Sequence, residues 1–250
     1  MKENLVQYIY GIADNALILG QRLGELCGHG PNLETDIALT NIALDLLGQT
    51  RSYYQYAAKL IGENATEDTL AFLRSEREYK NVLLVEQPNT DFAYSIGRQF
   101  LFDVFHLLLL KELQKSDDAV FAAIASKSIK EVSYHQRFSS DWIRRLGDGN
   151  EESHIRMQTA IDDLWTFTDE LFHQTDADKL MTTANIGVDV TRLKEPYYAI
   201  VMGILTESTL QIPDQKYFQK GGKHGIHSEH MGYLLADMQY MQRTFPNMQW

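Results

Sequence analysis

An acidic residue followed three positions later by a histidine is the pattern with which helical bundles bind pairs of metal ions. Both side chains lie on one helix face, so they can share a metal. Asp103 and His106 have this spacing, whereas Glu131 is followed by Tyr134 at three positions and His135 at four. One residue rotates a side chain by roughly 100° around a helix, so His135 cannot simply take the place of a histidine at position 134.

A complete di-metal centre also needs a second Glu-x-x-His motif and two further carboxylates. Asp45 offers a carboxylate, but Gly48 stands three residues later, where a histidine is required. The pattern therefore predicts a degenerate site without bound metal, with this residue set: Asp45, Asp103, His106, Glu131 and His135. An independent di-metal oxidase that uses these same residues is the alternative.

Chance limits the weight of these pairs. The chain has 34 acidic residues and eight histidines, so about one Asp/Glu-x-x-His pair is expected at random. Two others occur, at Glu151/His154 and at Glu170/His173. A buried, hydrogen-bonded polar pair is therefore favoured for Asp103 and His106, because isolated charges are costly to bury. A cluster of histidines near residue 227 is interpreted as surface or hinge residues.

A short basic run, Arg74–Asn81, is the second candidate for a binding function. It carries a cation at every third position, with a tyrosine and an asparagine beside them. Cations bind phosphate, but Glu76 and Glu78 interrupt the run. A solvated face of mixed charge therefore remains open beside a ligand site.

The elements that position these residues are helices, because apolar residues recur at helical spacing and no strand pattern competes. The second helix, for example, has Leu33, Ile37, Leu44, Leu47, Tyr54 and Ala58 along it. Four long helices form two hairpins, 4–61 and 91–146, joined by the connection 62–90. Shorter helices are expected at 66–74, 151–172, 191–210 and 228–245, with an irregular stretch at 173–190 and a cap at Ser116 for the fourth long helix. The fold class is therefore an all-α, four-helix bundle with one long crossover and additional C-terminal helices.

Composition limits the class of function. A net charge of −11 argues against nucleic-acid binding, since phosphate backbones repel an acidic surface. No apolar run reaches the length of a membrane span, and the N-terminus does not resemble a signal peptide. The single cysteine, Cys27, suits a reducing compartment. We expect one cytoplasmic domain over residues 1–250.

Five stretches, read together, resemble the C subunit of the bacterial phenylacetyl-CoA ring epoxidases of phenylacetate catabolism. They are GQRLGELCGHGP, IALTNIALDLLGQTR, EDTLAFLRSEREYKNVLLVEQPN, EVSYHQRFSSDWIRRLGDG and GGKHGIHSEHMGYLLADMQYMQRTFPNMQW.

The resemblance implies a ferritin-like fold and a structural, non-catalytic role. In that family a homologous A subunit holds the di-iron centre and binds phenylacetyl-CoA. A separate reductase with FAD and an iron–sulfur cluster binds transiently and supplies electrons from NADPH. No cofactor and no catalytic residue is then expected in this chain. If the CoA tail reaches the subunit boundary, the predicted contacts are Arg77, Glu78, Tyr79, Lys80 and Asn81.

Overall fold

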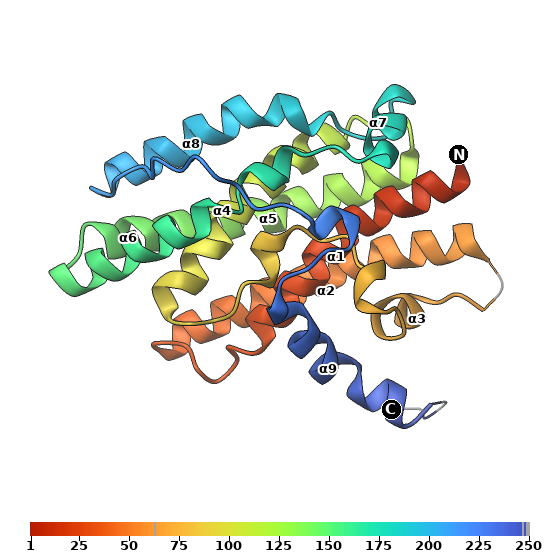
Figure 1. Cartoon of the computed structure of the whole chain (residues 1–250), viewed down its shortest axis with the longest axis horizontal. Helices are drawn as coiled ribbons and strands as arrows, with labels where there is room; N and C mark the ends of the chain where they lie inside the picture. The colour runs from red at the N-terminus through yellow and green to blue at the C-terminus, as the bar shows by residue number, and fades with distance from the viewer. Residues whose placement is uncertain (63, 247, 249–250) are drawn as a thin grey trace. The chain divides into compact units, whose positions relative to one another are not determined.

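The computed structural model describes residues 1–62, 64–246 and 248, and this part of the chain contains helices and loops but no strand (Figure 1). The predicted all-α class is confirmed, and the arrangement agrees with a ferritin-like helical fold. The chain divides into two compact units, Met1–Glu86 with Gly221–Trp250 and Gln87–Lys220. The assignment of residues 1–250 to a single domain stays a prediction.

Unit 1 is built on a hairpin of two long helices, α1 (Lys2–Gly24) and α2 (Leu33–Ile61), which pack along each other. The Asn32 side chain caps α2 by accepting a hydrogen bond from the Thr35 amide, which satisfies one of the free donors at the helix start. Gly62 ends α2 with φ of 81°, a conformation that glycine adopts without strain. The remaining elements of unit 1 are α3 (Glu67–Phe72), the 3₁₀ turns η1 (Glu76–Glu78), η2 (Leu83–Glu86) and η5 (Gly222–His224), and α9 (Glu229–Thr244).

The buried face of α2 differs from the predicted stripe. Leu33, Ile37 and Leu44 are 71%, 51% and 60% exposed, whereas Ile42 and Leu46 are fully buried. The helix carries two apolar stripes at helical spacing, and only the stripe that faces α1 and the rest of the core is covered. Leu33, Ile37 and Leu44 thus have the predicted helical spacing but lie outside the core.

Unit 2 contains the second long hairpin, α4 (Phe92–Leu113) and α5 (Ala119–Gly147). The two helices pack along each other, and α6 (Glu151–Trp165) packs on α4. The Asp91 side chain caps α4 at the Tyr94 amide. The other elements are η3 (Asp169–Phe172), α7 (Asp176–Thr183), η4 (Val190–Leu193) and α8 (Lys194–Glu207). The predicted starts and ends of the long helices hold to within a few residues.

Local boundaries in unit 2 required correction. Asp118 caps α5 by accepting from the Val120 and Phe121 amides, whereas the Ser116 hydroxyl donates to the Ile186 carbonyl. The stretch 173–190, predicted as irregular, contains α7, which begins with a capping box at Thr175. The predicted helix 151–172 ends at residue 165 and continues as the separate turn η3.

In the part of the chain that the structure describes, no helix combines the length and the apolar character needed to cross a membrane. Cys27 is exposed and its thiol forms no disulfide.

Candidate functional site

A fully buried group of polar side chains, which includes the predicted site residue Asp103, links α4 and α5. The two carboxyl oxygens of Asp103 accept hydrogen bonds from Gln99 Nε2 at 2.6 Å and from Ser139 Oγ at 2.8 Å. His106 and His135 are also buried. The favoured interpretation of Asp103 as a buried, hydrogen-bonded residue agrees with this geometry.

Burial shifts the titration of this cluster strongly. The enclosed site raises the pKa of Asp103 from 3.8 to about 7, although His135 and the donors Ser139 and Gln99 oppose the shift. Burial lowers the pKa of His106 to about 3, and the neighbouring His135 adds to this effect. The His106 ring lies 5.1 Å from the Phe102 ring, centroid to centroid, and its Nδ1 has no hydrogen-bond partner among the described residues. His106 is therefore a neutral imidazole in apolar surroundings near pH 7.

The register of α5 corrects the expected ligand pattern. His135 faces the interior, whereas Tyr134 is 39% exposed and Glu131 is partly exposed. The residue three positions before His135 on the buried side is Val132. On α5 the imidazole of His135 is thus enclosed, whereas Glu131 lies at a partly exposed position. The buried face of α5 offers an imidazole but a valine where a carboxylate is needed.

The expected contribution of α2 is also absent from its buried face. Asp45 is partly exposed. Gly48 is exposed, and beyond its chain neighbours and the nearby helix backbone no atom lies within 4 Å of the place where its side chain would begin, so a histidine there would face solvent. Throughout residues 1–62, 64–246 and 248, no three His, Cys, Asp or Glu side chains come together in a way that could hold a metal ion. The residues present therefore do not fit a di-iron centre.

Arg74, at the start of the basic run, is a structural residue of unit 1. Its guanidinium group donates to both carboxyl oxygens of Asp14, at 2.6 and 3.0 Å. It also lies 4.4 Å from the Tyr10 ring centroid and 4.1 Å from that of Tyr79. Burial opposes the positive charge, but the Asp14 carboxylate outweighs it and raises the pKa of Arg74. Arg74 thus stays charged and fastens residues 74–80 to α1, with Asp14 also accepting from the Lys80 amide.

The other residues of the predicted CoA contact divide into an inner and an outer set. Tyr79 and Asn81 are fully buried, so neither side chain presents a surface to a ligand. Glu78 is exposed and accepts hydrogen bonds from the Ser75 amide and hydroxyl, which lower its pKa. Arg77 is exposed, and the partly exposed Lys80 donates to the Arg77 carbonyl through Nζ at 3.0 Å. Of the five predicted residues, only Arg77 and Lys80 therefore offer accessible cations.

A buried ion pair that the sequence did not predict fastens the C-terminal part of unit 1. His227 Nδ1 lies 3.0 Å from Glu86 Oε2 and its Nε2 lies 3.1 Å from the Tyr79 carbonyl oxygen. The Ser228 amide donates to the other Glu86 oxygen at 2.7 Å. Burial disfavours the charge of His227, but Glu86 raises its pKa overall. No local signal could reveal this pair, because its members are 141 residues apart.

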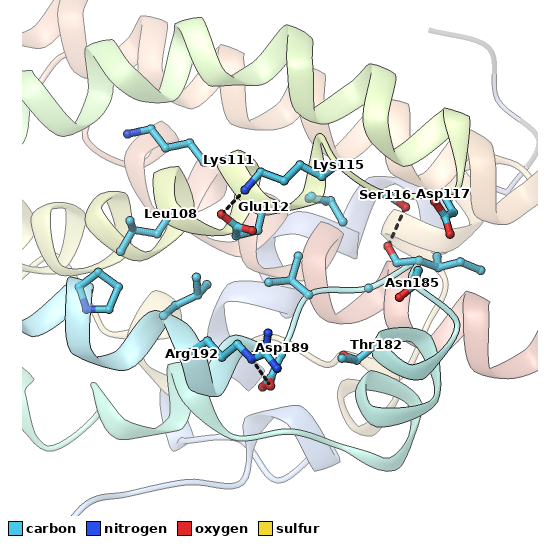
Figure 2. Close-up of a pocket in the computed structure, with 16 residues that line it drawn as sticks. Leu108, Lys111, Glu112, Lys115, Ser116, Asp117, Thr182, Asn185, Asp189 and Arg192 are labelled. Atoms are coloured by element: carbon cyan, nitrogen blue, oxygen red, sulfur yellow. Dashed lines mark hydrogen bonds and ion pairs between the residues drawn. The ribbon is translucent and has the colours of Figure 1, made fainter.

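A cavity of about 710 Å³ opens in unit 2 between the C-terminal end of α4 and the loop that leads from α7 to η4 (Figure 2). Lys115 forms an ion pair with Glu112 on the α4 side, and Arg192 forms one with Asp189 on the opposite wall. The basic and acidic residues that line it are equal in number: Lys111, Lys115 and Arg192 against Glu112, Asp117 and Asp189. The cavity thus lacks the excess of positive charge that attracts phosphate groups.

Comparison with known proteins gives two matches that cover the chain. Residues 1–250 match the family described as "Phenylacetic acid catabolic protein". A protein of Escherichia coli (strain K12), the C subunit of 1,2-phenylacetyl-CoA epoxidase, is 49% identical over 246 residues, which are 98% of this chain and 99% of that protein. The chain therefore belongs to the phenylacetic acid catabolic protein family.

Proposed function

We propose that this chain is the non-catalytic, structural subunit of a multicomponent phenylacetyl-CoA epoxidase, where it supports the catalytic subunit that holds the di-iron centre. The E. coli relative carries the name of an epoxidase subunit and matches over nearly its whole length. The homologous catalytic subunit is the stable partner in this proposal. A reductase with FAD and an iron–sulfur cluster is the transient one, and the location is the cytoplasm.

The observation that carries the non-catalytic role is the chemistry of the buried α4–α5 cluster. Both carboxyl oxygens of Asp103 already accept hydrogen bonds, and the buried face of α5 presents Val132 in place of a second carboxylate. Iron ions that react with oxygen in helical bundles are held by several carboxylate ligands. This donor set supports a scaffold and disfavours the alternative of an independent di-metal oxidase, whose remaining ligands Asp45 and Glu131 lie at partly exposed positions.

Metal analysis tests this proposal directly. The chain purified alone from iron-supplemented cells should contain far less than one iron per chain. Two tightly bound irons per chain that are lost in Glu131→Ala would refute the scaffold role and favour the oxidase. Co-expression with the catalytic subunit should give one peak in size-exclusion chromatography, and two separate peaks at micromolar concentration would contradict the association.

A turnover experiment separates support from catalysis. In the complex reconstituted with its reductase, Asp103→Asn in this chain should leave NADPH-dependent epoxidation of phenylacetyl-CoA unchanged. The matched control is a metal-ligand substitution in the catalytic subunit, which should abolish it. Loss of turnover in Asp103→Asn without loss of assembly would place Asp103 in the reaction and overturn the proposal.

The substrate contact of this chain is proposed for Arg77 and Lys80, with phenylacetyl-CoA lying at the subunit boundary. CoA carries a 3′-phosphate and a pyrophosphate, for which exposed cations are suitable partners. Both side chains have accessible surface, and Lys80 Nζ donates to the Arg77 backbone carbonyl at 3.0 Å, so its charge lies close to the backbone of Arg77. The enclosed Tyr79 and Asn81 support this pair by shaping the backbone of the loop rather than by touching the ligand.

A further inference from the structure

The outer face of α9 is an exposed stripe of aromatic and apolar side chains. Tyr233 and Tyr240 are 76% and 60% exposed, and Met241 and Phe245 are 40% and 45% exposed. Tyr233, Asp237 and Tyr240 follow each other at intervals of four and three residues, so they lie on one side of the helix. Figure 1 shows α9 as the last helix of the chain, leading away from the α1–α2 hairpin.

The inner face of the same helix is bound to the rest of unit 1. Met231 and Leu234 are buried, and Gln239 Nε2 donates to the Arg74 carbonyl and to the Tyr79 hydroxyl, both at 2.9 Å. Arg243 donates to the Arg74 carbonyl as well, at 2.9 Å. The helix is therefore already folded and oriented, so a partner that binds the outer face does not have to order it.

The exposed area reaches the size of the largest apolar patch on a typical monomer, and such patches are often functional. Buried aromatic side chains contribute about 200 Å² each, so the exposed fractions of Tyr233, Tyr240 and Phe245 correspond to roughly 350 Å². Apolar patches on monomeric proteins rarely exceed a few hundred Å². With Met241 the stripe supplies about half of the 800 Å² that one side of a standard interface buries, and tyrosine, phenylalanine and methionine are enriched in such interfaces.

Charge distinguishes between the possible occupants of this face. Asp237 lies in the middle of the stripe, between Tyr233 and Tyr240, and is exposed. The lysines and arginines of α9 amount to Arg243 alone, whose guanidinium group is bound to backbone carbonyls. A second copy of this chain, which also carries a net charge of −11, would place like carboxylates near each other. A less acidic partner with a basic residue opposite Asp237 avoids that repulsion.

We propose that the outer face of α9, formed by Tyr233, Asp237, Tyr240, Met241 and Phe245, docks into an apolar groove with a basic rim on the catalytic subunit. The inference rests on the proposed function, since it assigns the surface through which the structural subunit is held in the complex. An exposed amphipathic helix that enters a groove through residues seven apart is a recurrent mode of recognition.

Affinity measurements on the full-length chain test the surface. Titration of the purified catalytic subunit with Tyr233→Ser/Tyr240→Ser should give a Kd at least about 100-fold higher than wild type, since exposed tyrosines at interface centres are typical hot spots. Asp237→Lys should raise Kd about 10-fold. The matched control is Ile155→Ser/Leu180→Ser, two exposed apolar residues on the separate helices α6 and α7, which should change Kd less than about 3-fold. Circular dichroism of each isolated variant verifies folding. The variants should remain folded, because exposed side chains contribute little to stability.

Three outcomes would overturn the proposal in distinguishable ways. If the wild-type chain does not bind the catalytic subunit, the proposed function fails and this surface fails with it. If wild type binds and the double tyrosine variant binds equally well, only the docking surface is wrong. If light scattering shows that the isolated chain is a dimer which the tyrosine substitutions dissociate, while the complex with the catalytic subunit is unchanged, the face belongs to a second copy.

Discussion

Asp103→Asn should stabilise the protein considerably more at pH 8 than at pH 5. In the folded state burial raises the pKa of Asp103 from 3.8 to about 7, so between these values the folded state binds a proton that the unfolded chain has released. The stability contributed by this proton is greatest at low pH and is lost as the pH rises from about 4 to about 7. The difference between the two pKa values corresponds to about 4 kcal/mol.

The geometry of the site should accept the amide. Asparagine has the size of aspartate, and its Oδ1 can keep the hydrogen bond from Gln99 Nε2. The Ser139 hydroxyl, which now donates to Asp103, lies 3.0 Å from the His135 carbonyl oxygen and can donate there while it accepts from the new amide. The substitution therefore removes the charge that is costly to bury at pH 8 without leaving an unpaired group.

Urea-induced unfolding at pH 5 and at pH 8 measures the effect. Asp103→Asn should raise the free energy of unfolding at pH 8 by about 2–4 kcal/mol, below the full 4 kcal/mol because the amide hydrogen bonds are weaker than those of a carboxylate. Ser139→Ala is the matched control, since it removes a donor but keeps the carboxyl group. A loss of stability at pH 8 in Asp103→Asn would refute the reasoning, because it would show that Asp103 and His135 form a stabilising ion pair.

Three further predictions concern other parts of the chain. Glu86 raises the pKa of His227 in the folded state. The stability that His227 contributes is therefore present below about pH 6.5 and is lost as the pH rises through the folded-state pKa. The thermal unfolding temperature of His227→Gln should change less between pH 6 and 9 than that of wild type. Reversing the charge at Arg77 and Lys80 should raise the KM for phenylacetyl-CoA in the assembled complex, and unchanged kinetics would leave these residues as a solvated face. Asp118→Ala should lower the free energy of unfolding by about 1 kcal/mol through loss of the α5 cap, whereas Asp118→Asn should keep most of the stability, and equal losses in both variants would contradict the cap.

The two buried ion pairs of unit 1 explain why the C-terminal segment belongs to it. Arg74 and Asp14 fix the connection after α3 onto α1, and Glu86 with His227 fixes the last part of the chain onto that connection. Removing one member of a buried ion pair strongly destabilises the protein, because the other charge remains without a partner. The start of α9 is therefore tied to residues far away in the sequence. The rest of this helix presents the proposed docking face.

The positions of the long helices follow from local patterns of residues. Hydrophobic spacing placed the long helices to within a few residues, because this signal acts over one or two helical turns, whereas the cap predicted at Ser116 lies at Asp118. The sequence also indicated that a full ligand set is missing, since the count of acid–histidine pairs on the long helices needs no coordinates. The family resemblance was carried in the same way by contiguous stretches of residues.

Which helix faces are buried and which polar groups meet depends on packing between elements that are far apart in the chain. On α2 two apolar stripes satisfy the same spacing, and contact with other elements covers the one with Leu46 while it leaves Leu44 exposed. On α5 the packing selects His135 for the interior and Tyr134 for the surface. The enclosure of Tyr79 and the pairing of Glu86 with His227 depend on contacts between residues far apart in the chain. The spacing of residues along a helix records its periodicity but not its rotation, and that rotation is set by whichever packing buries the most apolar surface.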